Sequence, residues 1–126
     1  IIMEKNYIVL EAEFLLENGN KDEILNIMNE CTVQRKSKQP LEYGSAGSTF
    51  KRPEGHFAGK LIQDAGLAGY TVGGAQVSEK HAGFVINKGN ASFSDVMSVI
   101  EDVRRIVKEK TGYDLECEPV IISDKM

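Results

Sequence analysis

The residues best suited to chemistry lie in one short stretch, residues 44–53, which reads GSAGSTFKRP. Its two glycines allow positive φ angles and a close approach of the backbone to a ligand, and exposed N–H groups in such a turn can bind an anion. Lys51 and Arg52 add fixed positive charge. We interpret the stretch as a loop that holds an anionic substrate and places the Ser48 hydroxyl against it. A tight turn with solvated cations explains the same pattern equally well.

Few other residues form a pattern typical of catalysis or metal binding. His56 and His81 are isolated and have no third ligand at metal spacing, so no metal site is predicted and each is more typical of a surface or packing residue. Glu116 and Glu118 fall on one face of an expected strand. Burial would raise the pKa of such a carboxyl group and make it an acid, whereas exposure would make it part of a solvated face. The glycine cluster at 44–53 lacks the Walker ending, and a second glycine cluster at 69–74 lacks the dinucleotide-binding fingerprint.

Length and composition indicate one soluble globular domain. The chain has 126 residues, is 41% hydrophobic and 27% charged, and has a formal net charge of −4. Neither nucleic acid nor an acidic membrane is therefore an expected partner. No segment is apolar enough to span a bilayer, and Cys31 and Cys117 fit no metal spacing, which predicts a cytoplasmic protein with reduced thiols. The first residues look unlike the start of a folded unit, so we expect a fragment.

The elements that must position these residues follow no strict βαβ order, which favours an α+β fold with a small mixed sheet and about three helices. Alternation and apolar runs predict strands at 7–16, 75–78, 84–87 and 115–122. Helical spacing predicts helices at 21–33, 57–65 and 92–110. Ser92 and Asp95 stand at the offset of a capping box.

Four segments, in this order, strongly resemble the UDP-N-acetylenolpyruvoylglucosamine reductases, a flavoenzyme family also called UDP-N-acetylmuramate dehydrogenases. The segments are SAGSTFKRP at 45–53, FAGKLIQDAGL at 57–67, GGAQVSEKHAGF at 73–84 and LECE at 115–118. The likeness runs from about residue 35 to residue 122 and covers only the C-terminal part of the family's protein. The compact length between residues 69 and 92 resembles the shorter subtype of the family.

The resemblance implies an enzyme of peptidoglycan synthesis that uses NADPH and FAD to reduce the enolpyruvyl ether of a UDP-sugar to a lactyl ether. It implies that Ser48 protonates the substrate and that Glu118 assists this acid chemistry. FAD and NADPH would be bound mainly by a region outside this chain, so the fragment alone is expected to be inactive. The substrate diphosphate needs cations, for which the candidates are Arg35, Lys38, Lys51 and Arg52. Three further candidates for substrate binding lie in a matched segment: Gln76, Ser78 and His81.

The same resemblance predicts three parts of the chain. Residues 1–17 would form a strand that belongs with a flavin-binding lobe, 18–114 the substrate-binding domain, and 115–126 a C-terminal strand and tail that carry Glu118. Exposed edges of the two terminal strands would invite pairing with another copy, so we expect self-association. Two other functions stay open: a non-catalytic module that binds nucleotide-sugars or other phosphates, and a structural or assembly domain.

Overall fold

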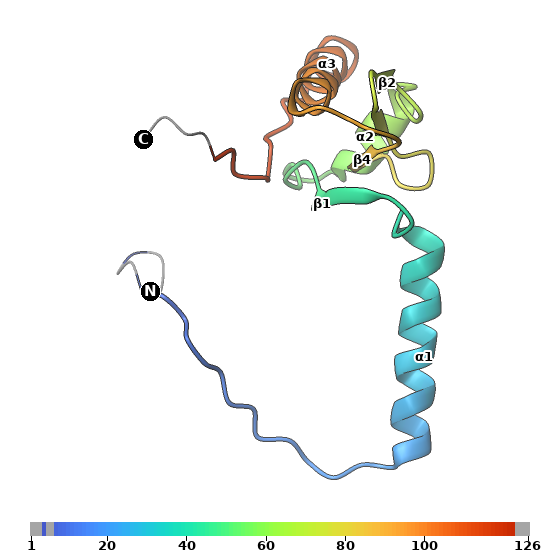
Figure 1. Cartoon of the computed structure of the whole chain (residues 1–126), viewed down its shortest axis with the longest axis vertical. Helices are drawn as coiled ribbons and strands as arrows, with labels where there is room; N and C mark the ends of the chain where they lie inside the picture. The colour runs from blue at the N-terminus through green and yellow to red at the C-terminus, as the bar shows by residue number, and fades with distance from the viewer. Residues whose placement is uncertain (1–3, 5–6, 123–126) are drawn as a thin grey trace. The chain divides into compact units, whose positions relative to one another are not determined.

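The computed structural model describes residue 4 and residues 7–122. The chain divides into two units, Ile1–Thr32 and Val33–Met126. Among the described residues, three helices and four strands follow one another (Figure 1). The helices are α1 (Lys21–Lys38), α2 (Ala58–Asp64) and α3 (Phe93–Thr111), and the strands are β1 (Gly44–Ser48), β2 (Thr71–Val72), β3 (Ala75–Val77) and β4 (Phe84–Asn87). This arrangement confirms the α+β class and the three helices.

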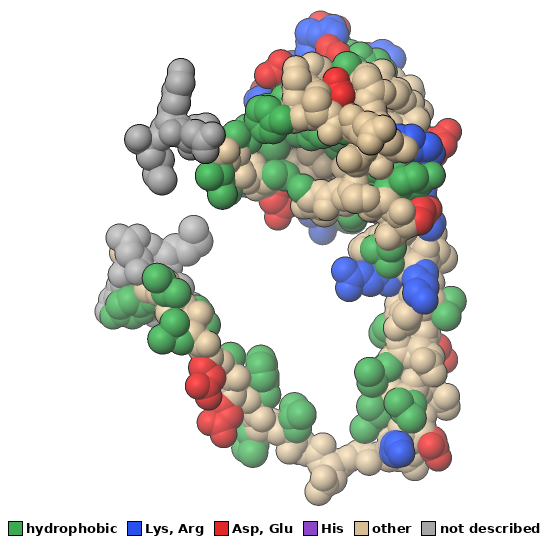
Figure 2. Space-filling model, in the orientation of Figure 1, with side chains coloured by type: hydrophobic (Ala, Val, Ile, Leu, Met, Phe, Trp, Pro, Cys, Tyr) green, Lys and Arg blue, Asp and Glu red, His purple; other side chains and the backbone are tan. Residues whose placement is uncertain are grey.

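The first unit consists of an extended segment followed by most of α1. Residues 7–20 form neither helix nor strand, so the predicted strand at 7–16 is wrong. Alternating apolar residues are not enough to make a strand, because its N–H and C=O groups also need a neighbouring backbone to pair with. Apolar side chains line the extended segment without being buried (Figure 2).

Helix α1 begins where the sequence indicates and ends later than expected. The Asn20 side chain accepts hydrogen bonds from the N–H groups of Asp22 (2.9 Å) and Glu23 (3.3 Å), as an N-cap residue does. The helix runs to Lys38, five residues beyond the predicted end at 33, and stops two residues before Pro40. No residue of α1 is buried.

A four-stranded sheet in the order β1-β4-β3-β2 forms the centre of the second unit. All pairings among these strands are antiparallel, where a mixed sheet was expected. Strands β3 and β4 lie where the sequence predicts them. Strand β2 and a tight turn at Gly73, with φ of 53°, occupy a stretch for which no strand was predicted. Strand β1 occupies the first half of the stretch at 44–53, which was predicted to be a loop. The loop prediction is therefore wrong for residues 44–48.

Helix α3 covers this sheet and supplies much of the core. It packs against β2, β3, β4 and α2, and its buried residues recur at helical spacing: Val99, Ile100, Val103 and Val107. The predicted capping box is confirmed, because Ser92 Oγ accepts the Asp95 N–H while the Asp95 carboxylate accepts the Ser92 N–H. The helix ends at Gly112, whose left-handed φ of 79° suits a C-cap glycine.

The segment after α3 pairs with the chain beyond β1 rather than forming a full strand. Phe50 and Cys117 make one antiparallel bridge, flanked by hydrogen bonds from Lys51 N to Glu116 O (2.8 Å) and from Glu118 N to Thr49 O (3.0 Å). Pro119 has no N–H to extend this ladder. The predicted strand at 115–122 is therefore reduced to a short pairing, which still brings Glu118 beside the chain that follows Ser48.

Candidate active site

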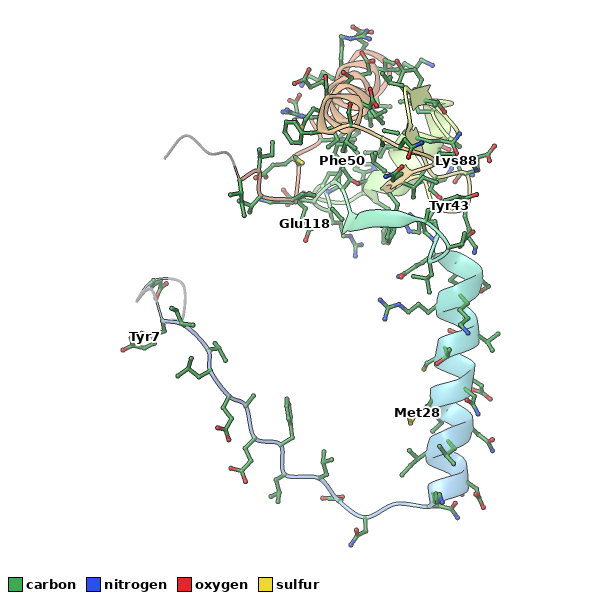
Figure 3. All side chains as sticks on the ribbon, viewed as in Figure 1. Tyr7, Met28, Tyr43, Phe50, Lys88 and Glu118 are labelled. Carbon is green, nitrogen blue, oxygen red and sulfur yellow. The ribbon has the colours of Figure 1, made fainter. Side chains whose placement is uncertain are left out.

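A cleft of about 650 Å3 in the second unit collects most of the predicted site residues. Its walls come from the end of β1, the start of α2, the β3–β4 connection and the C-terminal segment. Five predicted residues line it: Ser48, Lys51, Arg52, His81 and Glu118. Figure 3 shows Phe50 and Glu118 in the same part of the second unit, where the end of β1 meets the C-terminal segment. The fold thus brings together residues that lie far apart in the sequence.

Ser48 lies at the end of β1 and is accessible from solvent. Its hydroxyl is 3.4 Å from the Phe50 carbonyl oxygen, which makes this hydrogen bond a long one. Ser48 is paired with Phe84 of β4 across an irregular step in the ladder. A strand with a local irregularity, and not a free loop, therefore positions the hydroxyl at the cleft.

Lys51 interacts with two carboxylates of the C-terminal segment. Its ammonium group donates a hydrogen bond to Glu116. This bond, the charge of Glu116 and a smaller effect of Glu118 raise the pKa of Lys51, so its positive charge is retained at neutral pH. The pair is largely solvated, since the Lys51 side chain is 52% exposed, and such pairs add little stability. Lys51 can therefore exchange Glu116 for an anionic ligand at small energetic cost.

Arg52 provides the second cation of this wall. Its guanidinium carbon lies 4.0 Å from the centre of the Phe57 ring, in a cation–π arrangement. Lys60 and Lys80, which also line the cleft, are paired with carboxylates of Asp64 and Glu42. Within the described part of the chain Arg52 makes no ion pair, so its charge is available to a ligand.

His81 is held in a defined orientation. Its Nδ1 accepts a hydrogen bond from the Gly83 N–H (3.1 Å). Its ring packs edge-on against the Phe84 ring, with 4.9 Å between the two ring centres. A Cβ at Gly59 would lie 3.2 Å from His81 Cε1, and a Cβ at Gly83 would lie 3.0 Å from the same atom. Both glycines therefore make room for the ring. Because Nδ1 is an acceptor, the proton of a neutral ring is on Nε2. His81 can therefore offer a hydrogen-bond donor to a cleft ligand.

Four residues with predicted binding roles lie outside the cleft lining. Ser78 is 1% exposed, and its hydroxyl accepts the N–H groups of Lys80 and His81, so it shapes the turn that presents His81. Gln76 donates to Gly69 O and Thr71 Oγ1. Arg35 donates to Gln39 near the end of α1, and Lys38 is the last residue of that helix. The structure thus favours structural roles for Ser78 and Gln76.

Sequence reasoning missed Phe57 as a site residue. Helical spacing placed it on the buried face of a helix at 57–65, but it is the N-cap residue of α2 and its side chain is 61% exposed. The available signal was its position five residues after Arg52, because a guanidinium group and an aromatic ring often stack. A periodic pattern does not distinguish a buried first residue from one that precedes the helix.

No group of three or more His, Cys, Asp or Glu side chains is arranged to hold a metal ion among residue 4 and residues 7–122. In the same part of the chain, no helix is both long enough and apolar enough to cross a bilayer.

Comparisons with known proteins give consistent results. Residues 39–122 match a family model described as UDP-N-acetylenolpyruvoylglucosamine reductase, C-terminal domain. The chain is 63% identical over 126 residues to the reductase of that name from Lachnoclostridium phytofermentans, covering 100% of this chain and 41% of that protein. It is 58% identical over 125 residues to the reductase from Caldanaerobacter subterraneus subsp. tengcongensis, covering 99% of this chain and 41% of that protein.

A solved structure gives the same result at the level of the fold. The crystal structure of the Thermus caldophilus UDP-N-acetylenolpyruvylglucosamine reductase (MurB) matches with a TM-score of 0.64 and 40% identity. The match covers 81% of this chain and 36% of that one. The chain thus spans about two fifths of the length of the curated relatives described above, at 41% of each.

Proposed function

Because this chain belongs to the family of the C-terminal domain of UDP-N-acetylenolpyruvoylglucosamine reductase, we propose that it is the substrate-binding and acid–base part of that oxidoreductase. The substrate would be a UDP-sugar with an enolpyruvyl ether, reduced to the lactyl ether for peptidoglycan synthesis in the cytoplasm. One observation carries the proposal: Ser48 and Glu118 line a single cleft with the cations Lys51 and Arg52.

Ser48 is proposed as the acid of this reaction. Reduction of a carbon–carbon double bond adds a hydride to one carbon and a proton to the other, and the Ser48 hydroxyl would donate that proton. A serine hydroxyl is a weak acid and needs nearby positive charge to stabilise the developing alkoxide. Lys51 supplies such charge on the same cleft wall, and Glu118 would assist by returning a proton to the serine.

The remaining polar groups would bind and orient the substrate. A diphosphate is recognised by cations and by N–H donors, and Arg52, Lys51 and His81 offer both kinds of group at the cleft. Arg52 suits this role because its guanidinium is planar and Phe57 holds it in place.

FAD and NADPH are the cofactors that the family resemblance implies, and they would supply the reducing equivalents. The glycine clusters of the described residues do not form a dinucleotide-binding turn. The first glycine cluster forms the antiparallel strand β1, and the second leads into the β2–β3 hairpin. Neither cluster makes the strand–turn–helix that cradles a pyrophosphate. Both cofactors would therefore be held mainly by other parts of the whole protein.

The test is Ser48→Ala in the full-length protein, assayed as oxidation of NADPH in the presence of the UDP-linked enolpyruvyl sugar. Turnover is expected to fall by about 10²-fold or more, in the range for loss of a general acid, while substrate binding changes little. Ser94→Ala, at an exposed serine of α3, is the matched control and is expected to behave as the unsubstituted enzyme. Turnover that survives in Ser48→Ala contradicts the assignment.

A binding assay separates catalysis from recognition alone. If this chain binds UDP but the full-length protein never reduces the substrate, the non-catalytic module that binds nucleotide-sugars or phosphates would be favoured. Under either function, Arg52→Ala is expected to lose UDP binding. Lys108→Ala is the control and should bind UDP as before, because Lys108 is a cation outside the cleft lining.

Self-association through exposed edges stays a prediction, and a monomeric mass in solution would contradict it.

A further inference from the structure

The irregular step between β1 and β4 lies immediately before Ser48. Ser45 is opposite Ile86 and Ser48 is opposite Phe84, so two residues of β1 face one residue of β4 between these pairs. Two residues against one make a β-bulge. Because side chains alternate between the faces of a strand, one inserted residue moves every following side chain to the other face. The bulge therefore puts Ser48 on the sheet face that Phe84 shares, whereas a regular strand would turn it away.

Gly47 gives the backbone the shape that this bulge needs. Its φ is 85°, in the left-handed region that glycine adopts freely, that Asn and Asp tolerate, and that other residues rarely occupy. A Cβ at Gly47 would meet no heavy atom within 4 Å. The space for a side chain is therefore open, and only the backbone conformation restricts the residue type.

Thr49 satisfies the backbone group that the bulge leaves without a ladder partner. The Val85 N–H donates to Thr49 Oγ1 (3.0 Å), where a regular antiparallel pair would offer a carbonyl. Thr49 is only 3% exposed, and its own N–H donates to Gly83 O (2.8 Å). A buried N–H without an acceptor is unfavourable, so this hydroxyl stabilises the bulged register.

We propose that Gly47 and Thr49 are positioning residues that aim the Ser48 hydroxyl into the cleft. Gly47 allows the extra residue, and Thr49 holds the resulting register by accepting the Val85 N–H. Neither residue lines the cleft, so both would act through Ser48. This inference rests on the proposed role of Ser48 as the acid.

The first test compares Gly47→Ala, Gly47→Asn and Ser48→Ala in the full-length reductase. Alanine is disfavoured at this φ and should shift Ser48, which lowers kcat by roughly 10- to 100-fold, as small misplacements of catalytic groups do. KM should change little, whereas the thermal unfolding temperature should fall by a few degrees, because alanine adds backbone strain at this φ but meets no neighbouring atom. Asparagine tolerates the left-handed conformation and should restore kcat to within about threefold of the unsubstituted enzyme.

Three results would overturn the inference. Gly47→Ala could retain kcat, alanine and asparagine could lower it equally, or a crystal structure of Gly47→Ala could show Ser48 still opposite Phe84 in an unchanged bulge. The crystal structure does not depend on activity. The outcomes also separate the two proposals. Turnover that survives in Ser48→Ala contradicts the proposed function. Turnover that is lost in Ser48→Ala but retained with full kcat in Gly47→Ala contradicts only this inference.

The second test addresses Thr49. Thr49→Val keeps the shape of the side chain and removes the acceptor, whereas Thr49→Ser keeps the hydroxyl. Hydrogen exchange at the Val85 amide should become at least about tenfold faster in Thr49→Val and stay near the original rate in Thr49→Ser, and kcat should follow the same order. Equal protection of the Val85 amide in the valine and serine variants would show that the hydroxyl does not hold the bulge.

Discussion

The two units use their apolar residues in opposite ways. Every described residue of the first unit is exposed, and Leu10 and Leu16 are 92% and 82% accessible. In the second unit Ile62 and Val103 are completely buried. The hydrophobic effect stabilises a fold only where an opposing apolar surface removes area from water. Both units therefore contain apolar residues. Only the second unit has layers that bury them, namely a sheet and helices α2 and α3.

The largest expected effect tests this difference directly with one residue type. Ile62→Ala in the second unit should lower the free energy of unfolding of the full chain by about 2–5 kcal/mol, because a buried side chain is lost and a cavity is left. Ile8→Ala, at a residue that is 85% exposed in the first unit, should change it by less than about 0.5 kcal/mol. Urea denaturation measures both. Equal losses would mean that the first unit contributes to the same cooperative core.

A second prediction sharpens the comparison by testing how densely the second unit is packed. A Cβ at Gly74 would lie 2.2 Å from the Gly89 carbonyl oxygen, so Gly74→Ala forces two backbone segments apart. The free energy of unfolding should fall by about 1–3 kcal/mol, as for other overpacked sites. Gly89→Ala is the matched control, since nothing lies within 4 Å of its Cβ. A stable Gly74→Ala would indicate a looser hairpin than the structure shows.

The helix caps offer the same comparison at smaller magnitude. Ser92→Ala removes the cap of α3 and should lower the free energy of unfolding by about 1 kcal/mol, because α3 is part of the core. Asn20→Ala removes the cap of α1, which buries no residue, and should leave the main unfolding transition unchanged while reducing the helical circular dichroism signal slightly. A shift of the main transition in Asn20→Ala would contradict the independence of α1.

The smallest effect concerns pH. The N–H groups of Ser92 and then Gly74 donate to the Asp95 carboxylate and lower its pKa below the ordinary value of 3.8. Such a group stabilises the fold above its unfolded pKa, and the contribution is lost as the pH falls through the folded value. Asp95→Asn should therefore flatten the decline in stability below pH 4. Asp22→Asn, in the first unit, should leave this acid decline as steep as before, and equal curves for both variants would refute the assignment.

Regular elements with a strong local signal were predictable. The spacing of Ile100, Val103 and Val107, together with Ser92, located α3 to within a residue, and β4 was located from its short apolar run between turns. The likeness of four segments to a known reductase family was also readable from the residues. These features depend on neighbours along the chain, so a linear sequence contains them.

Strand β1 and the short C-terminal pairing were not predictable in the same way. Glycine and alanine, which make up three of the five residues of β1, have low strand propensity. The strand exists because β4 offers backbone partners and Gly47 accommodates the bulge. Conversely, residues 7–16 alternate well and yet form no strand in the structure. Pairing energy comes from a second backbone, which local propensity does not describe.

The sequence by itself determined the chemical groups of the candidate site, the helices with their caps, and the family. Only the tertiary structure decided which groups meet: it brings Ser48 and Glu118 to one cleft with Arg52, and it places Ser78 in a buried turn. The physical reason is that each residue type is a local property. The face on which a side chain emerges depends on register and on a partner strand distant in the chain.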